Sequence, residues 1–122
     1  MLLFAAVALL LPSMVVASDD TESFTSWVPD PIGIKKIERK LRLPDRHYKL
    51  RDYIRYYWGT DEDGVPILNA EFQIPSDDTE KAGTVIIGRP VKMYFDGGCA
   101  IVTLRWNMAS NDLVGIRCNG VA

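Results

Sequence analysis

Residues 53–74 read YIRYYWGTDEDGVPILNAEFQI, and this stretch decides the fold. Residues 53–58 are rich in aromatic and β-branched side chains, which suit a pleated surface. Residues 59–64 (GTDEDG) are turn-forming, and residues 65–74 then alternate between two faces. One face holds Leu68, Ala70, Phe72 and Ile74, and the other holds Asn69, Glu71 and Gln73. This pattern predicts a β-hairpin, with Pro66 near a strand start or on a sheet edge because proline donates no ladder hydrogen bond.

A second hairpin is predicted near the C-terminus. Residues 100–106 (AIVTLRW) and 113–118 (LVGIRC) are strand-like, and residues 107–112 join them. The register that places the apolar side chains on one face pairs Val102 with Ile116, Leu104 with Val114, and Ala100 with Cys118. Cys99 then points away from Cys118. We expect this hydrophobic register, with a bulge at Gly97 and Gly98 that turns the Cys99 thiol back.

Cys99 and Cys118 are the only cysteines, and we expect them to form a structural disulfide. Such a bond would stabilise a small domain by about 3 kcal/mol. The two cysteines lack the C-x-x-C spacing of redox motifs. The chain has one histidine, His47, so neither a tetrahedral zinc site nor Cys–His catalysis is supported.

The expected disulfide agrees with an apolar leader at the N-terminus. Residues 2–11 read LLFAAVALLL, and Val15 and Ala17 occupy the small-residue positions of a signal-peptidase site. We therefore expect a signal peptide at 1–17, a disordered or loosely docked segment at 18–29, and a single domain at 30–122. The expected location is the periplasm or the outside of the cell, with no transmembrane segment left after cleavage.

One amphipathic helix is expected after the leader. Asp30 is a candidate N-cap and Pro31 a candidate first residue, since proline suits that position. Ile34, Ile37 and Leu41 recur at helical spacing, and Pro44 predicts an end near residue 42. A short strand is expected at 84–87, which residues 91–95 would extend or replace.

Together these elements predict an α+β fold. It has one N-terminal amphipathic helix packed on a mainly antiparallel sheet of four to five strands, ending in a disulfide-closed hairpin.

Basic residues are unevenly distributed along the chain. The net charge is −2, yet nine of the 14 lysines and arginines fall between residues 35 and 55. The candidate partner-binding residues from this segment and the first strand are Lys35, Lys36, Arg39, Lys40, Arg55, Tyr56, Tyr57 and Trp58. They would suit an anionic protein or an anionic envelope surface. The alternative is a solvated helix face. The negative net charge and the expected export argue against nucleic acid.

No motif in the sequence specifies a catalytic site, a cofactor or a metal. Residues 61–64 (DEDG) lack the ligand spacing of an EF-hand, and Gly97–Gly98 lacks the helix and the lysine of a P-loop. We therefore expect a non-enzymatic domain that acts by binding a partner. The alternatives are a small secreted enzyme whose site is assembled from dispersed residues, and a structural or stress-related envelope protein.

Three short stretches carry a resemblance. They are Arg55-Tyr56-Tyr57, Asp96-Gly97-Gly98-Cys99 and Cys118-Asn119-Gly120. The chain resembles small exported proteins of alphaproteobacteria that carry R-Y-Y, a late D-G-G-C and a terminal C-N-G. The resemblance spans roughly residues 53–122. It implies a periplasmic or secreted bacterial protein with a disulfide-closed C-terminal hairpin, and it implies no activity and no catalytic residue.

Overall fold

The computed structural model describes residues 25–77, 79–92 and 97–120. The expected signal peptide at 1–17 and the first part of the expected segment at 18–29 lie outside these residues. Two 3-10 turns, Leu50–Asp52 and Gly98–Ala100, accompany the main elements. Those elements are β1 (Thr25–Trp27), α1 (Pro31–Glu38), β2 (Ile54–Glu62), β3 (Val65–Gln73), β4 (Val85–Ile87), β5 (Ile101–Asn107) and β6 (Asp112–Cys118).

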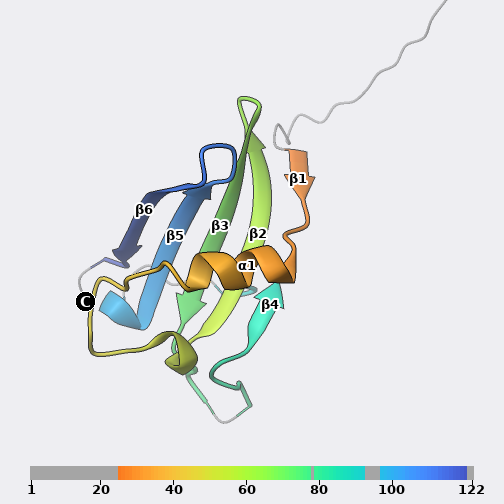
Figure 1. Ribbon diagram of the computed structural model, residues 1–122. Coiled ribbons are helices and arrows are strands. Elements are labelled where there is room, and N and C mark those ends of the chain that lie inside the picture. Colours follow the sequence, from red (N-terminus) through yellow and green to blue (C-terminus); the bar gives the residue numbers. More distant parts are fainter. Residues whose placement is uncertain (1–24, 78, 93–96, 121–122) are drawn as a thin grey trace, which may run out of the picture.

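One twisted sheet organises the molecule, with α1 lying across one of its faces (Figure 1). The strand order is β1-β2-β3-β5-β6, and every pair along this path is antiparallel. β4 also pairs with β2, in the parallel direction. β1 pairs with residues 59–61 and β4 with residues 55–57. Two short strands therefore share one edge of the long strand β2.

The predicted α+β fold with four to five strands is wrong. The described residues form a mainly antiparallel sheet of six strands with one short helix of eight residues. The strand missed by the sequence prediction is β1, which lies in the segment expected to be disordered or loosely docked. A three-residue strand is too short to show an alternating pattern, so its pairing with β2 left no signal in the sequence.

The helix is also shorter than predicted, because it ends at Glu38 instead of near residue 42. Leu41 and Leu43 both pack against the core beyond its end. Side chains two positions apart point to nearly opposite sides of a helix but to the same side of an extended chain. The two leucines can therefore both contact the core only because the helix has already ended.

The first predicted hairpin is confirmed. β2 and β3 pair along their whole length, from Ile54 opposite Gln73 to Glu62 opposite Val65. The turn is only Asp63 and Gly64, with positive φ angles of 52° and 80°. Two central residues with positive φ give a turn whose twist matches that of the flanking strands. The strands consequently extend into the stretch 59–64 that the sequence predicted to be a loop.

The second hairpin forms, but the predicted register is wrong by two residues. Leu104 faces Ile116, and Val102 faces Cys118. A register shift between Arg105 and Trp106 leaves Val114 without an opposite residue, so the bulge lies in β6 and not before Cys99. A two-residue shift keeps each side chain on its original face. The apolar pattern alone therefore could not distinguish the two registers.

The core lies between α1 with its following loop and one face of the sheet. Ile34 and Ile37 are the buried residues of α1. From the sheet, the core residues are Tyr53, Tyr57, Leu68, Ala70, Phe72, Val102, Leu104 and Trp106. The opposite face of the sheet carries no helix among the described residues. No helix in the described part of the chain is long and apolar enough to cross a membrane.

Candidate functional site

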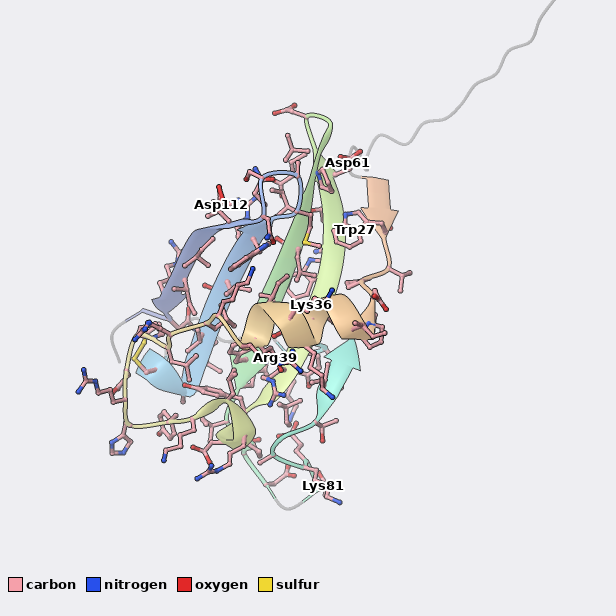
Figure 2. All side chains as sticks on the ribbon, in the orientation of Figure 1. Trp27, Lys36, Arg39, Asp61, Lys81 and Asp112 are labelled. Atoms are coloured by element: carbon pink, nitrogen blue, oxygen red, sulfur yellow. A yellow bond between two sulfur atoms is a disulfide. The ribbon has the colours of Figure 1, made fainter. Side chains whose placement is uncertain are left out.

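Exposed basic residues are concentrated on α1 and on the segment that follows it. We call this surface the basic face. It consists of eight exposed cations on α1 and on the segment that follows it: Lys35, Lys36, Arg39, Lys40, Arg42, Arg46, Lys49 and Arg51. Figure 2 shows Lys36 on α1 and Arg39 directly after its end, in front of the sheet. Lys40 also places its Nζ 5.9 Å from the ring centre of Trp106, so this lysine covers part of the core.

The three carboxylates within residues 35–55 are all occupied by internal contacts. Glu38 is bonded to Arg55 and Tyr57 beneath the helix. One carboxylate oxygen of Asp45 accepts a hydrogen bond from the backbone N–H of His47, and one of Asp52 accepts from that of Lys49. None of the eight cations forms an ion pair with a described residue. The outward charge of the basic face is therefore strongly positive.

One exposed apolar side chain lies at the N-terminal end of the basic face. Ile32 is 67% exposed. On a helix, residues three and four positions apart are neighbours, so Ile32 lies beside Lys36, and Lys36 beside Arg39. Val28, just before the helix, is 80% exposed. The end of the basic face at the N-terminus of α1 therefore presents two aliphatic side chains next to the cations.

Two of the predicted partner-binding residues, Arg55 and Tyr57, are buried on the core side of β2. Nε of Arg55 donates to Glu38 at 2.7 Å, and the hydroxyl of Tyr57 donates to the same carboxylate at 2.6 Å. Burial, reinforced by the hydrogen bond and the negative charge of Glu38, raises the pKa of Tyr57 well above its ordinary value. These two side chains attach α1 to the sheet and are not available to a partner at the surface.

Tyr56 and Trp58 alternate with them and so point to the opposite face of the sheet. Of the eight predicted partner-binding residues, the structure brings together only Lys35, Lys36, Arg39 and Lys40. The other four divide between the core and the far side. Sequence reasoning could not separate them, because neighbouring residues of a strand point to opposite faces and the side that α1 covers is a tertiary property.

The open face of the sheet contains a groove of about 470 Å³ that spans β2, β3, β5 and β6. We call it the sheet groove. Two rows of side chains cross it. The first row runs Trp58, Asn69, Arg105 and Gly115, and the second runs Tyr56, Glu71, Thr103 and Arg117. All of these except Tyr56 line the groove, together with Val114.

Several contacts hold the side chains of the sheet groove in place. The Arg89 guanidinium lies 5.5 Å from the ring centre of Trp58. Nδ2 of Asn69 donates to the hydroxyl of Thr60 at 2.9 Å. Arg105 forms an ion pair with Glu62. The groove residues were missed by sequence reasoning because they come from four strands whose order only the structure reveals.

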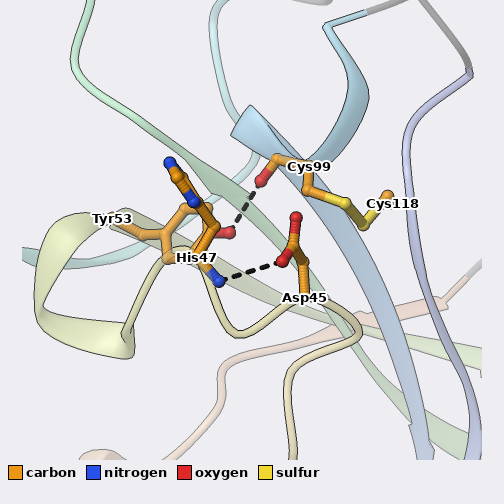
Figure 3. Close-up of a disulfide and its surroundings, with 5 residues drawn as sticks. All are labelled: Asp45, His47, Tyr53, Cys99 and Cys118. Atoms are coloured by element: carbon orange, nitrogen blue, oxygen red, sulfur yellow. Dashed lines mark hydrogen bonds between the residues drawn. A yellow bond between two sulfur atoms is a disulfide. The ribbon is translucent and has the colours of Figure 1, made fainter.

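The predicted disulfide is present at the lower end of the sheet. Cys99 and Cys118 are bonded, with their Cα atoms 4.5 Å apart. Gly97 and Gly98 have φ angles of 119° and 57°, which glycine adopts readily, and they lead into the 3-10 turn that holds Cys99. The hydroxyl of Tyr53 donates to the backbone carbonyl of Cys99 at 2.7 Å (Figure 3). Burial raises the pKa of Tyr53 to about 12.

His47 lies in the loop near the disulfide, where its backbone N–H is bonded to Asp45 and its ring packs edge-on against Tyr48 (Figure 3). Among the described residues there is no group of three or more histidine, cysteine, aspartate or glutamate side chains that could hold a metal ion.

Comparisons with protein-family models, with curated proteins and with solved structures returned no significant match for this chain.

Proposed function

We propose that this protein is an exported, non-enzymatic domain that binds an anionic membrane surface through its basic face. The observation that carries the proposal is the charge of that face. Eight exposed cations project from α1 and the following loop, while the carboxylates of the same segment are held by internal hydrogen bonds. A surface of this kind attracts the phosphate groups of anionic lipids.

The exposed aliphatic side chains support a membrane as the anionic partner. Ile32 lies beside Lys36 on the outward side of α1, and Val28 precedes the helix. In interfacial helices, apolar side chains enter the headgroup region while the surrounding cations bind the lipid phosphates. A polar, hydrated interface with a soluble acidic protein would leave Val28 and Ile32 exposed to water.

Each basic residue close to an anionic bilayer contributes about 1 kcal/mol to binding, and salt weakens this attraction over a Debye length of about 10 Å at 0.1 M. Several cations on one face therefore suffice for reversible attachment. The disulfide supports export, because such bonds persist mainly in oxidising compartments. Attachment to the outer or periplasmic surface of a membrane is consistent with both features.

The test is flotation of the purified, oxidised domain with vesicles. One set contains only phosphatidylcholine, and the other contains 30% phosphatidylglycerol. We expect binding only to the anionic vesicles, with loss of binding as salt is raised. The double variant Lys36→Glu, Arg39→Glu should weaken binding by at least ~30-fold, because two or more contributions of about 1 kcal/mol are removed. Ile32→Ser should weaken it severalfold without changing the salt dependence.

Lys81→Glu is the matched control. Lys81 is exposed and lies away from α1, at the end of the molecule opposite Asp61 and Asp112 (Figure 2). This variant changes the net charge by the same amount as Lys36→Glu or Arg39→Glu alone, and it should leave vesicle binding nearly unchanged. The proposal is overturned if the wild type does not bind the anionic vesicles, or if Lys81→Glu weakens binding as much as Lys36→Glu does alone.

A further inference from the structure

We infer that the sheet groove is a second binding site, on the face opposite the basic face, and that its ligand is an acidic oligosaccharide. This inference is independent of membrane binding. It rests on the two rows of side chains that cross β2, β3, β5 and β6, and on the cation of Arg117 at the β6 end of the groove.

The shape of the sheet groove favours an elongated ligand. Neighbouring strands lie about 4.8 Å apart, so the row from Trp58 on β2 to Gly115 on β6 spans about 14 Å. That length fits a short oligosaccharide better than a single sugar ring. The groove is open to solvent, and residues of the central strands β3 and β5 line it.

The backbone at the floor of the groove is already paired. β3 is bonded to β2 and β5, and β5 is bonded to β3 and β6. An extended peptide that recognises a sheet by strand addition needs an unpaired strand edge. A ligand over these central strands must therefore be recognised by side chains alone, which favours a saccharide with many hydroxyl groups over a peptide strand.

Polar side chains at the centre of the groove match those hydroxyl groups. Asn69, Glu71 and Thr103 come from the two central strands and together offer both donors and acceptors. Asn69 is oriented by Thr60, and Glu71 accepts a hydrogen bond from Gln73 at 2.7 Å. Side chains held in this way lose little conformational freedom when a ligand binds.

Trp58 supplies an aromatic wall at one end. Its indole lines the groove, and the Arg89 guanidinium lies over one face of the ring, 5.5 Å from its centre, which leaves the other face for a sugar. The face of an aromatic ring is electronegative, so it attracts the weakly positive C–H groups on the flat side of a sugar ring. A tryptophan wall beside a polar floor is therefore suited to a pyranose ring.

The other end of the groove is suited to a carboxylate. Arg117 forms no ion pair with a described residue, whereas the Arg105 guanidinium is paired with Glu62 on β2, on the other side of β3. Thr103 lies directly opposite Arg117, and Gly115 directly opposite Arg105. A Cβ built on Gly115 meets no atom within 4 Å, so the groove is open on β6 two residues before Arg117. Arginine pairs well with carboxylates because its planar fork can donate two parallel hydrogen bonds.

The test is calorimetric titration of the oxidised domain with trigalacturonate, the probe for the acidic class. Fully methyl-esterified trigalacturonate has the same rings without the charge, and hexaglutamate has charge without sugar rings. We expect trigalacturonate to bind at least tenfold more tightly than either comparison ligand. Arg117→Ala should remove most of the preference for the acid over the ester, and Trp58→Leu should weaken the binding of both saccharides.

Gly115→Leu should abolish saccharide binding by filling the groove. Gly115 has no positive φ and open space around its Cβ, so the variant should fold, and an unchanged circular dichroism spectrum and urea midpoint would confirm that it does. Lys36→Ala, on the opposite face, is the matched control and should bind trigalacturonate as the wild type does. The inference is overturned if the wild type does not bind trigalacturonate, if the ester binds equally well, or if hexaglutamate does.

Discussion

Gly59 allows β1 to join the sheet. The indole of Trp27 packs directly on this glycine, and an added Cβ would lie 2.3 Å from two ring atoms and 2.7 Å from the carbonyl oxygen of Trp27. The Trp27 Nε1–H donates to the carbonyl of Thr60 at 2.9 Å. The absence of a side chain at residue 59 is thus what lets the tryptophan lie flat against β2.

Gly59→Ala should therefore destabilise the domain by about 1–3 kcal/mol, the usual cost of overpacking a close contact. Urea unfolding would measure the loss, and hydrogen exchange should show faster exchange in β1. Gly33→Ala is the matched control. A Cβ at Gly33 meets nothing within 4 Å, and alanine favours a helix by roughly 0.5–1 kcal/mol over glycine. Equal destabilisation by both variants would contradict the role assigned to Gly59.

At the same scale, Arg55 and Tyr57 show the limit of reading residue types from a sequence. An arginine and a tyrosine beside a basic segment resemble a binding surface. Both are buried because Glu38, 17 and 19 residues away along the chain, supplies the charge and hydrogen-bond acceptor that they need. The pairing with Glu38 can be recognised only when the packing of α1 on β2 is known.

Among the elements, α1 is attached to the sheet by the pair between Glu38 and Arg55. Both side chains are almost buried, with 13% and 10% of their surfaces exposed. Nη1 of Arg55 also donates to the carbonyl of Leu50 at 2.7 Å, so the same arginine holds the loop that follows the helix. Removing the carboxylate would leave a buried cation without its counter-charge.

Glu38→Ala should accordingly lower the free energy of unfolding by about 3 kcal/mol, the usual effect of breaking a buried ion pair on one side. Glu62→Ala breaks the exposed pair with Arg105, whose side chains are 34% and 44% exposed, and should cost at most about 1 kcal/mol. Urea unfolding at pH 7 would measure both variants. Similar losses from both would show that Glu38 does not anchor the helix.

The elements differ in how well the sequence predicts them. The hairpin β2–β3 was predictable because two signals agree. Apolar and polar residues alternate along the strand, and Asp63–Gly64 is a typical hairpin turn. The end of α1 was not predictable, because it depends on the core contacts of Leu41 and Leu43, which form only in the folded structure. The register of β5 and β6 was not either, since valine and isoleucine at alternate positions of β6 satisfy the same face equally well.

For the molecule as a whole, charge is separated to different sides. Residues 35–55 hold nine cations and three acids of the 14 and 16 in the chain. Acidic residues such as Asp61 and Asp112 lie at the hairpin ends, away from α1 (Figure 2). The cationic side was predictable from the sequence because its residues are contiguous. The sheet groove was not, because its residues are up to 59 positions apart and meet only through the strand order.

The disulfide should supply a substantial part of the stability of this small domain. Cys99 and Cys118 are 19 residues apart, and closing a segment of that size stabilises a protein by about 3 kcal/mol in the chain-entropy model. The variant Cys99→Ser, Cys118→Ser should lose about that amount in urea unfolding. Adding a reductant should destabilise the wild type and leave the variant unchanged. A variant as stable as the oxidised wild type would contradict this.

The position of that bond also determines how the molecule would respond to a pulling force. β6 is an edge strand, and an edge strand can normally be peeled away one hydrogen bond at a time. Force applied at the C-terminal end, however, reaches Cys118 first. The disulfide then transmits it to Cys99, which precedes β5 in the chain. The ladder between β5 and β6 is therefore shielded from the load. The C-terminal side should yield only when the inner contact between β3 and β5 breaks, whereas β1, with three residues and no covalent link, would detach first under load from the other end.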